Sequence, residues 1–248
     1  MEPLRRRWFG WPSGWKTAVR RHWLLAALGL ALLASLLLVL PFRWLPPPAS
    51  AFMVQRYLAS LGARPADYRW RYQWTPWERI SPWAPLAVLA AEDQRFSAHR
   101  GFDFHALKDA VEDRLDGRRL RGASTLTQQV AKNLYLWPGR SLLRKGLEAY
   151  FTVLIEACWP KRRILEIYLN MAEFGDGIYG IEAASRHYFG KPAARLASWE
   201  AARLAAVLPS PRRWNPSRPT AYVKQRAGWI ARQMRLLGGT AFLQRLEG

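Results

Sequence analysis

One apolar run near the start of the chain limits its architecture more than any other feature. Residues 23–40 read WLLAALGLALLASLLLVL, with no charge and no proline, and with Pro41 and Phe42 the run reaches 20 residues. About 20 consecutive apolar residues in a helix span a hydrocarbon core of roughly 30 Å. The sequence therefore predicts one transmembrane helix over residues 23–42.

The charges before this run indicate its orientation. Residues 1–22 contain one acid, Glu2, and six basic residues: Arg5, Arg6, Arg7, Lys16, Arg20 and Arg21. Basic residues next to a span favour the cytoplasmic side. We expect a single-pass protein of the inner (cytoplasmic) membrane, with residues 1–22 as a cytoplasmic basic tail and the remaining chain periplasmic. A cleaved signal peptide is the alternative, because Ala49–Ala51 has a small-residue cleavage pattern, but the run exceeds the usual signal length and favours an uncleaved anchor.

The net charge of the chain limits the classes of partner that it can bind. The 248 residues have a formal net charge of +20, and 50% of them are hydrophobic, so the composition is not that of a disordered protein. An excess of this size indicates an anionic partner, or else a general bias toward arginine on a solvated surface. Export of the basic body argues against nucleic acid and leaves phospholipid or a phosphorylated substrate. The single cysteine, Cys158, excludes an internal disulfide framework.

The remaining chain divides into a linker and one helical domain. The residues RWLPPPAS at 43–50 break the first helix, and we expect residues 43–69 to be a juxtamembrane linker. Apolar residues recur at helical spacing in the segments that follow, whereas alternating strand patterns are scarce. The sequence predicts a mainly α domain over residues 70–248.

Two carboxylates stand on otherwise apolar helical segments. Glu92 lies one turn after Val88 and one turn before Phe96, so burial would raise its pKa and suit a general base. The alternatives are a solvated pair at a helix end or a buried acid paired with Arg95. Glu148 follows Arg144 and Lys145 by one turn, a spacing that most often gives ordinary surface salt bridges.

The segment 122–136, GASTLTQQVAKNLYL, predicts a helix with a neutral polar face, one cation, and an opposite apolar stripe of Leu126, Val130 and Leu134. Such a face suits sugar hydroxyls, amides and phosphates. A capping box, with Thr125 as the cap and Gln128 reaching back to it, is the structural alternative for those two residues. It does not account for Gln129, Lys132 or Asn133.

Four stretches together resemble the peptidoglycan glycosyltransferase family. They are AAEDQRFSAHRGFD, GASTLTQQVAKNLYL, RKGLEAYFTVLIE and KRRILEIYLNMAEFGDGIYGIEAASRHYFGK, in the order and spacing of that family's motifs between about residues 82 and 216. The chain has no room for a following transpeptidase domain, so it resembles the monofunctional members. The resemblance implies a lysozyme-like α-helical fold with a membrane-proximal jaw lobe whose loop lies around residues 134–143.

The resemblance also implies roles for individual residues. Glu92 and Glu148 correspond to the catalytic glutamates, the first as general base and the second as organiser of the leaving pyrophosphate. Residues implied to bind substrate or pyrophosphate are Ser124, Gln128, Gln129, Lys132, Asn133, Arg140, Arg144 and Lys145. No cofactor is certain, although the family leaves room for a divalent cation, Mg or Mn, near Glu148.

The implied reaction is polymerisation of lipid II, a lipid-linked disaccharide, into a growing glycan strand during cell wall biosynthesis. The expected partners are lipid II, the glycan strand, the membrane and cell-division or elongation proteins. Two rival hypotheses are a lytic muramidase-like enzyme on a related fold and a non-catalytic cell-wall scaffold. The basic residues near Glu148 argue against the first, since hydrolysis of a neutral glycan does not need them.

Overall fold

The computed structural model describes residues 13–62, 70–116, 124–139 and 141–246. The chain forms two compact units, Met1–Pro41 and Phe42–Gly248. The first unit contains helix α1 (Ser13–Val39). By length and composition, the stretch Arg20–Arg43 can cross a membrane, and α1 supplies most of it. The predicted N-terminal apolar helix is confirmed.

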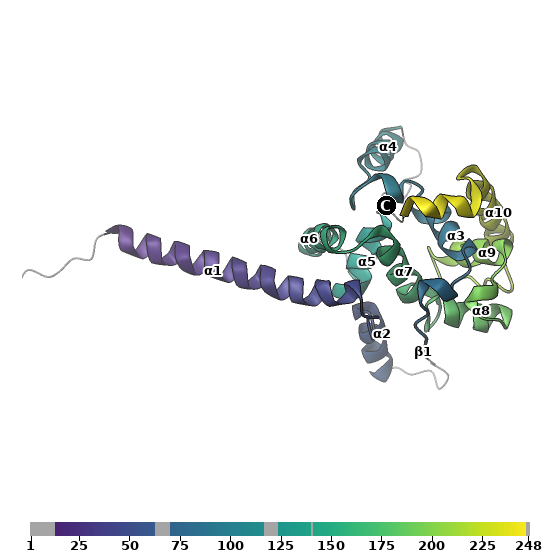
Figure 1. The fold of residues 1–248 in the computed structure, drawn as a ribbon, viewed down its shortest axis with the longest axis horizontal. Helices are drawn as coiled ribbons and strands as arrows, with labels where there is room; N and C mark the ends of the chain where they lie inside the picture. The colour runs from purple at the N-terminus through teal and green to yellow at the C-terminus, as the bar shows by residue number, and fades with distance from the viewer. Residues whose placement is uncertain (1–12, 63–69, 117–123, 140, 247–248) are drawn as a thin grey trace, which may run out of the picture. The chain divides into compact units, whose positions relative to one another are not determined.

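The second unit is mainly helical, as the sequence predicts. Its α-helices are α2 (Ala51–Gly62), α3 (Trp83–Glu92), α4 (Phe104–Leu115), α5 (Leu126–Tyr135), α6 (Leu142–Cys158), α7 (Lys161–Met171), α8 (Ile181–Phe189), α9 (Ser198–Val207) and α10 (Ala221–Leu236). Short 3₁₀ turns are η1 (Leu40–Arg43), η2 (Trp77–Arg79), η3 (Phe96–Ala98), η4 (Ala193–Arg195) and η5 (Gly239–Leu246). Helices α3, α9 and α10 pack together, and α5 packs against both α6 and α7 (Figure 1).

A small sheet completes the unit. It has the strand order β1-β3-β2, formed by β1 (Arg71–Tyr72), β2 (Glu173–Gly175) and β3 (Ile178–Tyr179). Strand β3 is parallel to β1 and antiparallel to β2, with a register irregularity in β2. The two- and three-residue lengths of these strands are why the sequence shows little alternating pattern.

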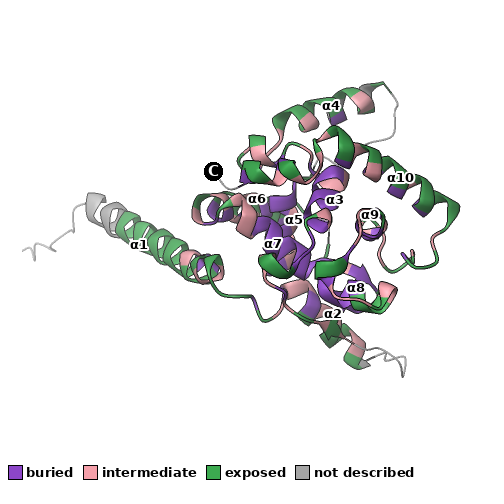
Figure 2. Cartoon of the chain, turned by 45° about the vertical axis from the view of Figure 1, so that its right-hand side comes forward, coloured by how far each residue is buried: buried purple, intermediate pink, exposed green. Residues whose placement is uncertain are grey.

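Helix α3 lies in the core of this unit. Every residue from Ala84 to Ala90 is buried (Figure 2). A helix that is apolar all round is stable only when neighbouring elements cover it, and α7, α9 and α10 pack against this one. Glu92 is the last residue of α3, so the packing of this core helix fixes the position of its backbone.

Polar side chains of α7 hold the segment that leads into α3. Asn170 is fully buried; its Oδ1 accepts from the Thr75 N–H at 2.8 Å, and its Nδ2 donates to the Thr75 carbonyl at 3.0 Å. Glu166 Oε1 accepts from the Trp77 N–H. Gly180 has a φ of 84°, and a Cβ there would lie 2.8 Å from the Asn170 carbonyl oxygen, so this close approach requires glycine.

Part of the expected linker, residues 43–69, is helical in the structure. Residues 51–62 of it form α2, which packs against α5. Met53 is 1% exposed, and Gln55 Nε2 donates to the Leu136 carbonyl at 3.0 Å. The prolines before it stop the first helix, but the residues beyond them are apolar enough to form another one. The second unit therefore begins at Phe42.

Candidate active site

Helix α5 begins with the capping box that the sequence predicts. Thr125 Oγ1 accepts from the Gln128 N–H at 3.3 Å, and Gln128 Oε1 accepts from the Thr125 N–H at 3.0 Å. This cap occupies the side-chain oxygen of Gln128, and only 8% of the residue is exposed, so the structure confirms the capping role of Gln128. The predicted apolar stripe of α5 is buried as well: Leu126, Val130 and Leu134.

Gln129 brings α5 into contact with Glu92. Gln129 Nε2 donates to Glu92 Oε2 at 3.0 Å, and the buried Tyr168 hydroxyl of α7 donates to Gln129 Oε1 at 3.2 Å. An amide has a donor end and an acceptor end, so the tyrosine hydroxyl orients the amide with its N–H group toward the carboxylate. The sequence motifs indicated Gln129 but not Tyr168.

A second group reaches Glu92 from α10. Arg226 Nη2 lies 3.9 Å from Glu92 Oε1, and the sequence analysis did not identify this residue. The alternative that Glu92 pairs with Arg95 is wrong, because Arg95 Nε lies 3.9 Å from Asp103 Oδ2 instead.

Burial controls the protonation of Glu92. Its side chain is 17% exposed, and Val88 and Phe96, which flank it, are both buried. Desolvation raises the pKa of Glu92 above its usual value of 4.5, while the hydrogen bond from Gln129 and the charge of Arg226 oppose that rise. The direction expected from the sequence is confirmed, and a raised pKa makes a carboxylate a stronger base.

Glu148 forms a buried cluster of charges on α6. Only 3% of the residue is exposed; Arg144 Nη1 donates to its Oε2 at 2.7 Å, and Lys145 Nζ donates to its Oε1. The Arg144–Glu148 pair is therefore buried and is not an ordinary surface salt bridge, whereas Lys145 reaches Glu148 from an exposed position. A buried carboxylate needs partners of this kind, and here both partners lie one turn earlier on the same helix.

Lys132 of α5 belongs to the same cluster. Burial lowers the pKa of Lys132 below 10.5, the charges of Arg144 and Lys145 lower it further, and Glu148 opposes them. Its Nζ also lies 5.8 Å from the centroid of the Phe52 ring. Three basic side chains share one carboxylate here, so the cluster has an excess of positive charge and can bind an anion.

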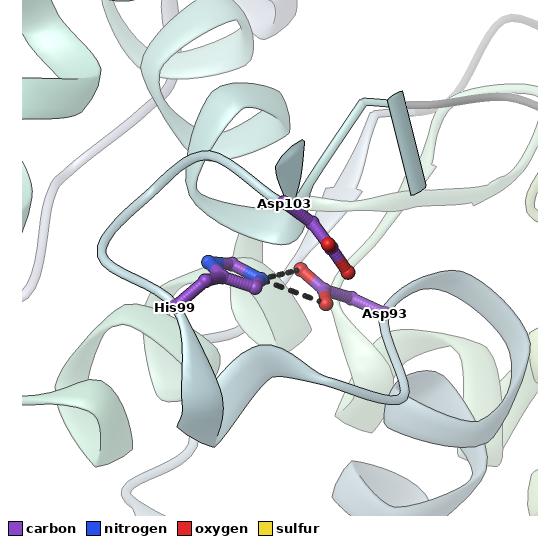
Figure 3. A group of neighbouring side chains, drawn as sticks. All are labelled: Asp93, His99 and Asp103. Atoms are coloured by element: carbon purple, nitrogen blue, oxygen red, sulfur yellow. Dashed lines mark hydrogen bonds and ion pairs between the residues drawn. The ribbon is translucent and has the colours of Figure 1, made fainter. Parts of the chain in front are cut away.

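A polar network lies directly after Glu92 (Figure 3). Asp93 is buried; its Oδ2 accepts from the Leu126 N–H at 3.0 Å, and His99 Nε2 lies 2.9 Å and 3.1 Å from its two oxygens. With Asp103, these residues place three ligand-type atoms within 4.8 Å of one another. However, Asp93 already accepts at both oxygens, and Asp103 Oδ1 caps α4 by accepting from two backbone N–H groups. The network therefore holds the start of α5 next to the end of α3.

Two other predicted residues lie on or just before α5, and one lies outside the described residues. Ser124 is exposed just before the cap, and Asn133 is half-buried beside Lys132 on α5. Arg140 lies outside the described residues. Helix α5 thus links two clusters, with Glu92 at one and Glu148 at the other.

Comparison with known proteins agrees with this geometry. A family model described as Transglycosylase matches residues 59–235. The match covers more than half of the chain, so the chain belongs to the transglycosylase family, whose domain is a lysozyme-like helical fold. Its members are glycosyltransferase enzymes.

Individual relatives make the comparison more specific. A protein of Xanthomonas campestris pv. campestris (strain B100) is 55% identical over 223 residues, which cover 90% of this chain and 91% of the relative. A protein of Pseudomonas putida (strain KT2440) is 56% identical over 214 residues, which cover 86% and 90%. Both are named biosynthetic peptidoglycan transglycosylase.

Proposed function

We propose that this protein polymerises the glycan chains of peptidoglycan. It transfers the growing lipid-linked glycan onto the 4-hydroxyl of lipid II and releases polyprenyl pyrophosphate. The family and the relatives support glycan polymerisation in cell wall synthesis. The observation that carries the proposal is that α5 joins a half-buried carboxylate, Glu92, to a cluster of cations around the buried Glu148.

Glu92 is the proposed general base. The 4-hydroxyl oxygen of the acceptor attacks the anomeric carbon of the donor, while Glu92 takes the hydroxyl proton. A carbon–oxygen bond forms, the anomeric carbon–phosphate oxygen bond breaks, and its electron pair leaves with the pyrophosphate. The pKa of Glu92, raised by burial, supports this role because a base is most effective when its pKa is near the working pH.

The cations of α5 and α6 are the proposed site for the leaving group. Lys132, Arg144 and Lys145 stabilise the charge that develops on the pyrophosphate. Glu148 holds Arg144 and Lys145 in place through its two oxygens. Arg140, Ser124 and Asn133 remain proposed contacts of the same substrate.

A divalent cation does not fit the residues around Glu148. Hard cations such as Mg²⁺ bind through carboxylate oxygens, but both oxygens of Glu148 accept hydrogen bonds from cations. Lys132 adds a third positive charge nearby. The proposed reaction therefore uses no metal at this position.

The membrane is the proposed setting of the reaction. Helix α1 would anchor the chain in the inner membrane, with residues 1–22 cytoplasmic and the second unit periplasmic, as the basic residues of the tail favour. Trp137, Leu142 and Leu143, around the start of α6, are exposed apolar residues. Contact with the membrane would remove these side chains from water. The lipid-linked substrate is found in the same membrane.

Incubation of the detergent-solubilised full chain with labelled lipid II tests the proposed function. We expect labelled glycan polymer to form. In Lys132→Ala, polymer formation should be much slower, while the melting temperature changes little. The same protein is incubated with isolated sacculi. Soluble muropeptides released from sacculi, with no polymer from lipid II, would indicate the lytic alternative, and neither product would indicate a scaffold.

A further inference from the structure

The two oxygens of Glu92 have different surroundings. Oε2 accepts a hydrogen bond from Gln129 at 3.0 Å. Oε1 lies 3.9 Å from Arg226 Nη2, which is an ion-pair distance but longer than a hydrogen bond. Arg226 therefore places a positive charge beside Oε1 without occupying the lone pairs that a proton needs.

The Arg226 side chain is partly buried between α10 and the end of α3. Its Nε is buried and, among the residues that the structure describes, has no hydrogen-bond partner. Its guanidinium carbon lies 5.9 Å from the centroid of the Trp229 ring, within reach of a cation–π interaction. Val223 and Ile230 are fully buried and fix α10, which packs against α3. The side chain is 25% exposed and lies at ion-pair distance from Glu92, so this arrangement places its charge at Glu92.

We propose that Arg226 is a positioning residue of the reaction. Its guanidinium keeps Glu92 ionised and leaves Oε1 as the oxygen that takes the proton of the acceptor hydroxyl. The proposal rests on the proposed role of Glu92 as general base. Besides Gln129 and Arg226, three groups act on Glu92. The charge of Asp93 disfavours its ionisation, and the charge of Lys132 favours it. The Tyr168 hydroxyl stays neutral at working pH, because burial raises its pKa.

The pH dependence of polymerisation tests this role. Removing a cation beside a carboxylate raises the pKa of that carboxylate. In Arg226→Met, we expect the acidic limb of kcat against pH to move upward by about one unit, which lowers kcat about tenfold below the new limb. The rate should recover at higher pH, with KM for lipid II changed less than twofold. Arg226→Lys retains the charge and should keep the limb near its wild-type position.

Arg232→Met is the matched control, because Arg232 is an exposed arginine of the same helix. It should leave both the limb and the rate unchanged. An Arg226→Met variant with a wild-type limb would overturn the proposal. An equal loss of rate at every pH, together with a lower melting temperature, would also overturn it, because Arg226 would then have a structural role only. Glu92→Gln separates the two proposals: substantial turnover in that variant would refute the base itself, whereas an inactive Glu92→Gln with an unmoved Arg226→Met limb would refute only the role of Arg226.

Discussion

Glu92 combines burial with a need for charge, and the two oppose each other. The folded-state pKa of Glu92 lies above its unfolded value near 4.5, because burial disfavours the carboxylate. The folded protein therefore binds this proton more tightly than the unfolded chain does. Its contribution to stability is fully present below pH 4.5 and is lost as pH rises through the folded-state pKa.

This linkage predicts a stability effect of Glu92→Gln. The amide has nearly the same shape and no charge, so the variant should unfold at a higher temperature than the wild type at pH 7.5. The difference should shrink as pH falls toward 4.5, where the wild-type carboxyl is protonated. Thermal unfolding followed by circular dichroism at several pH values measures it, and a variant that is less stable at pH 7.5 would contradict the stated cost of the buried charge.

Tyr168→Phe tests the orientation of Gln129. Without the hydroxyl, the Gln129 amide can rotate its oxygen toward Glu92, so we expect kcat to fall about three- to tenfold, equivalent to roughly 1 kcal/mol for one hydrogen bond. Tyr188→Phe is the control, because the Tyr188 hydroxyl donates to the Phe174 carbonyl outside this site. Equal rates for the two variants in the polymerisation assay would remove Tyr168 from the site.

Local sequence predicted the residues whose surroundings are set by their own helix. Val88 and Phe96 indicated a desolvated Glu92, and the one-turn spacing indicated the partners of Glu148. Arg226 and Tyr168 could not be found in this way, because packing of α10 and α7 brings them to the site from distant parts of the chain. Without the fold, nothing distinguishes Arg226 from the other arginines of this strongly basic chain.

At the scale of elements, α5 connects the two clusters of the site. A hydrogen bond holds its first residue to the α3–α4 connection, because the Leu126 N–H donates to Asp93 Oδ2. Its Thr125 cap donates from Oγ1 to the Gly101 carbonyl at 2.7 Å. The placement of Gln129 and Lys132 therefore depends on the cap as well as on the packing of the helix.

Thr125→Ala should weaken this element. The variant loses the N-cap and a buried hydrogen bond, which together cost about 2 kcal/mol of unfolding free energy. Thr125→Ser keeps the hydroxyl and should lose less than half of that. Chemical denaturation of both variants provides the measurement, and an unfolding free energy for Thr125→Ala equal to that of the wild type would contradict the capping role.

The sequence could predict these elements in part. The capping box and the apolar stripe of α5 follow from local spacing, and the structure confirms both. The assignment of residues 43–69 as a linker did not anticipate α2, because the prolines at 46–48 dominate the local signal. Ser50 caps this helix, since its Oγ accepts from the Met53 N–H at 3.1 Å, and packing against α5 covers its apolar residues.

At the scale of the whole molecule, charge and hydropathy are divided along the chain. The apolar helix α1 belongs to the first unit, whereas most of the excess of +20 lies in the second. A chain with an apolar helix in one unit and a basic surplus in the other would suit a substrate that combines a lipid tail with a pyrophosphate. The overall charge pattern thus agrees with the local one, in which Lys132, Arg144 and Lys145 outnumber Glu148.

We propose that Glu92 takes the proton of the acceptor hydroxyl, and steady-state polymerisation of lipid II by Glu92→Gln is the decisive measurement. Glu112→Gln, which changes an exposed carboxylate of α4, is the control. Loss of a general base typically costs 10²- to 10⁴-fold in rate, so we predict a fall in kcat of at least about 100-fold for Glu92→Gln. The control should keep the wild-type rate. Turnover by a folded Glu92→Gln within about tenfold of the wild type would contradict the claim.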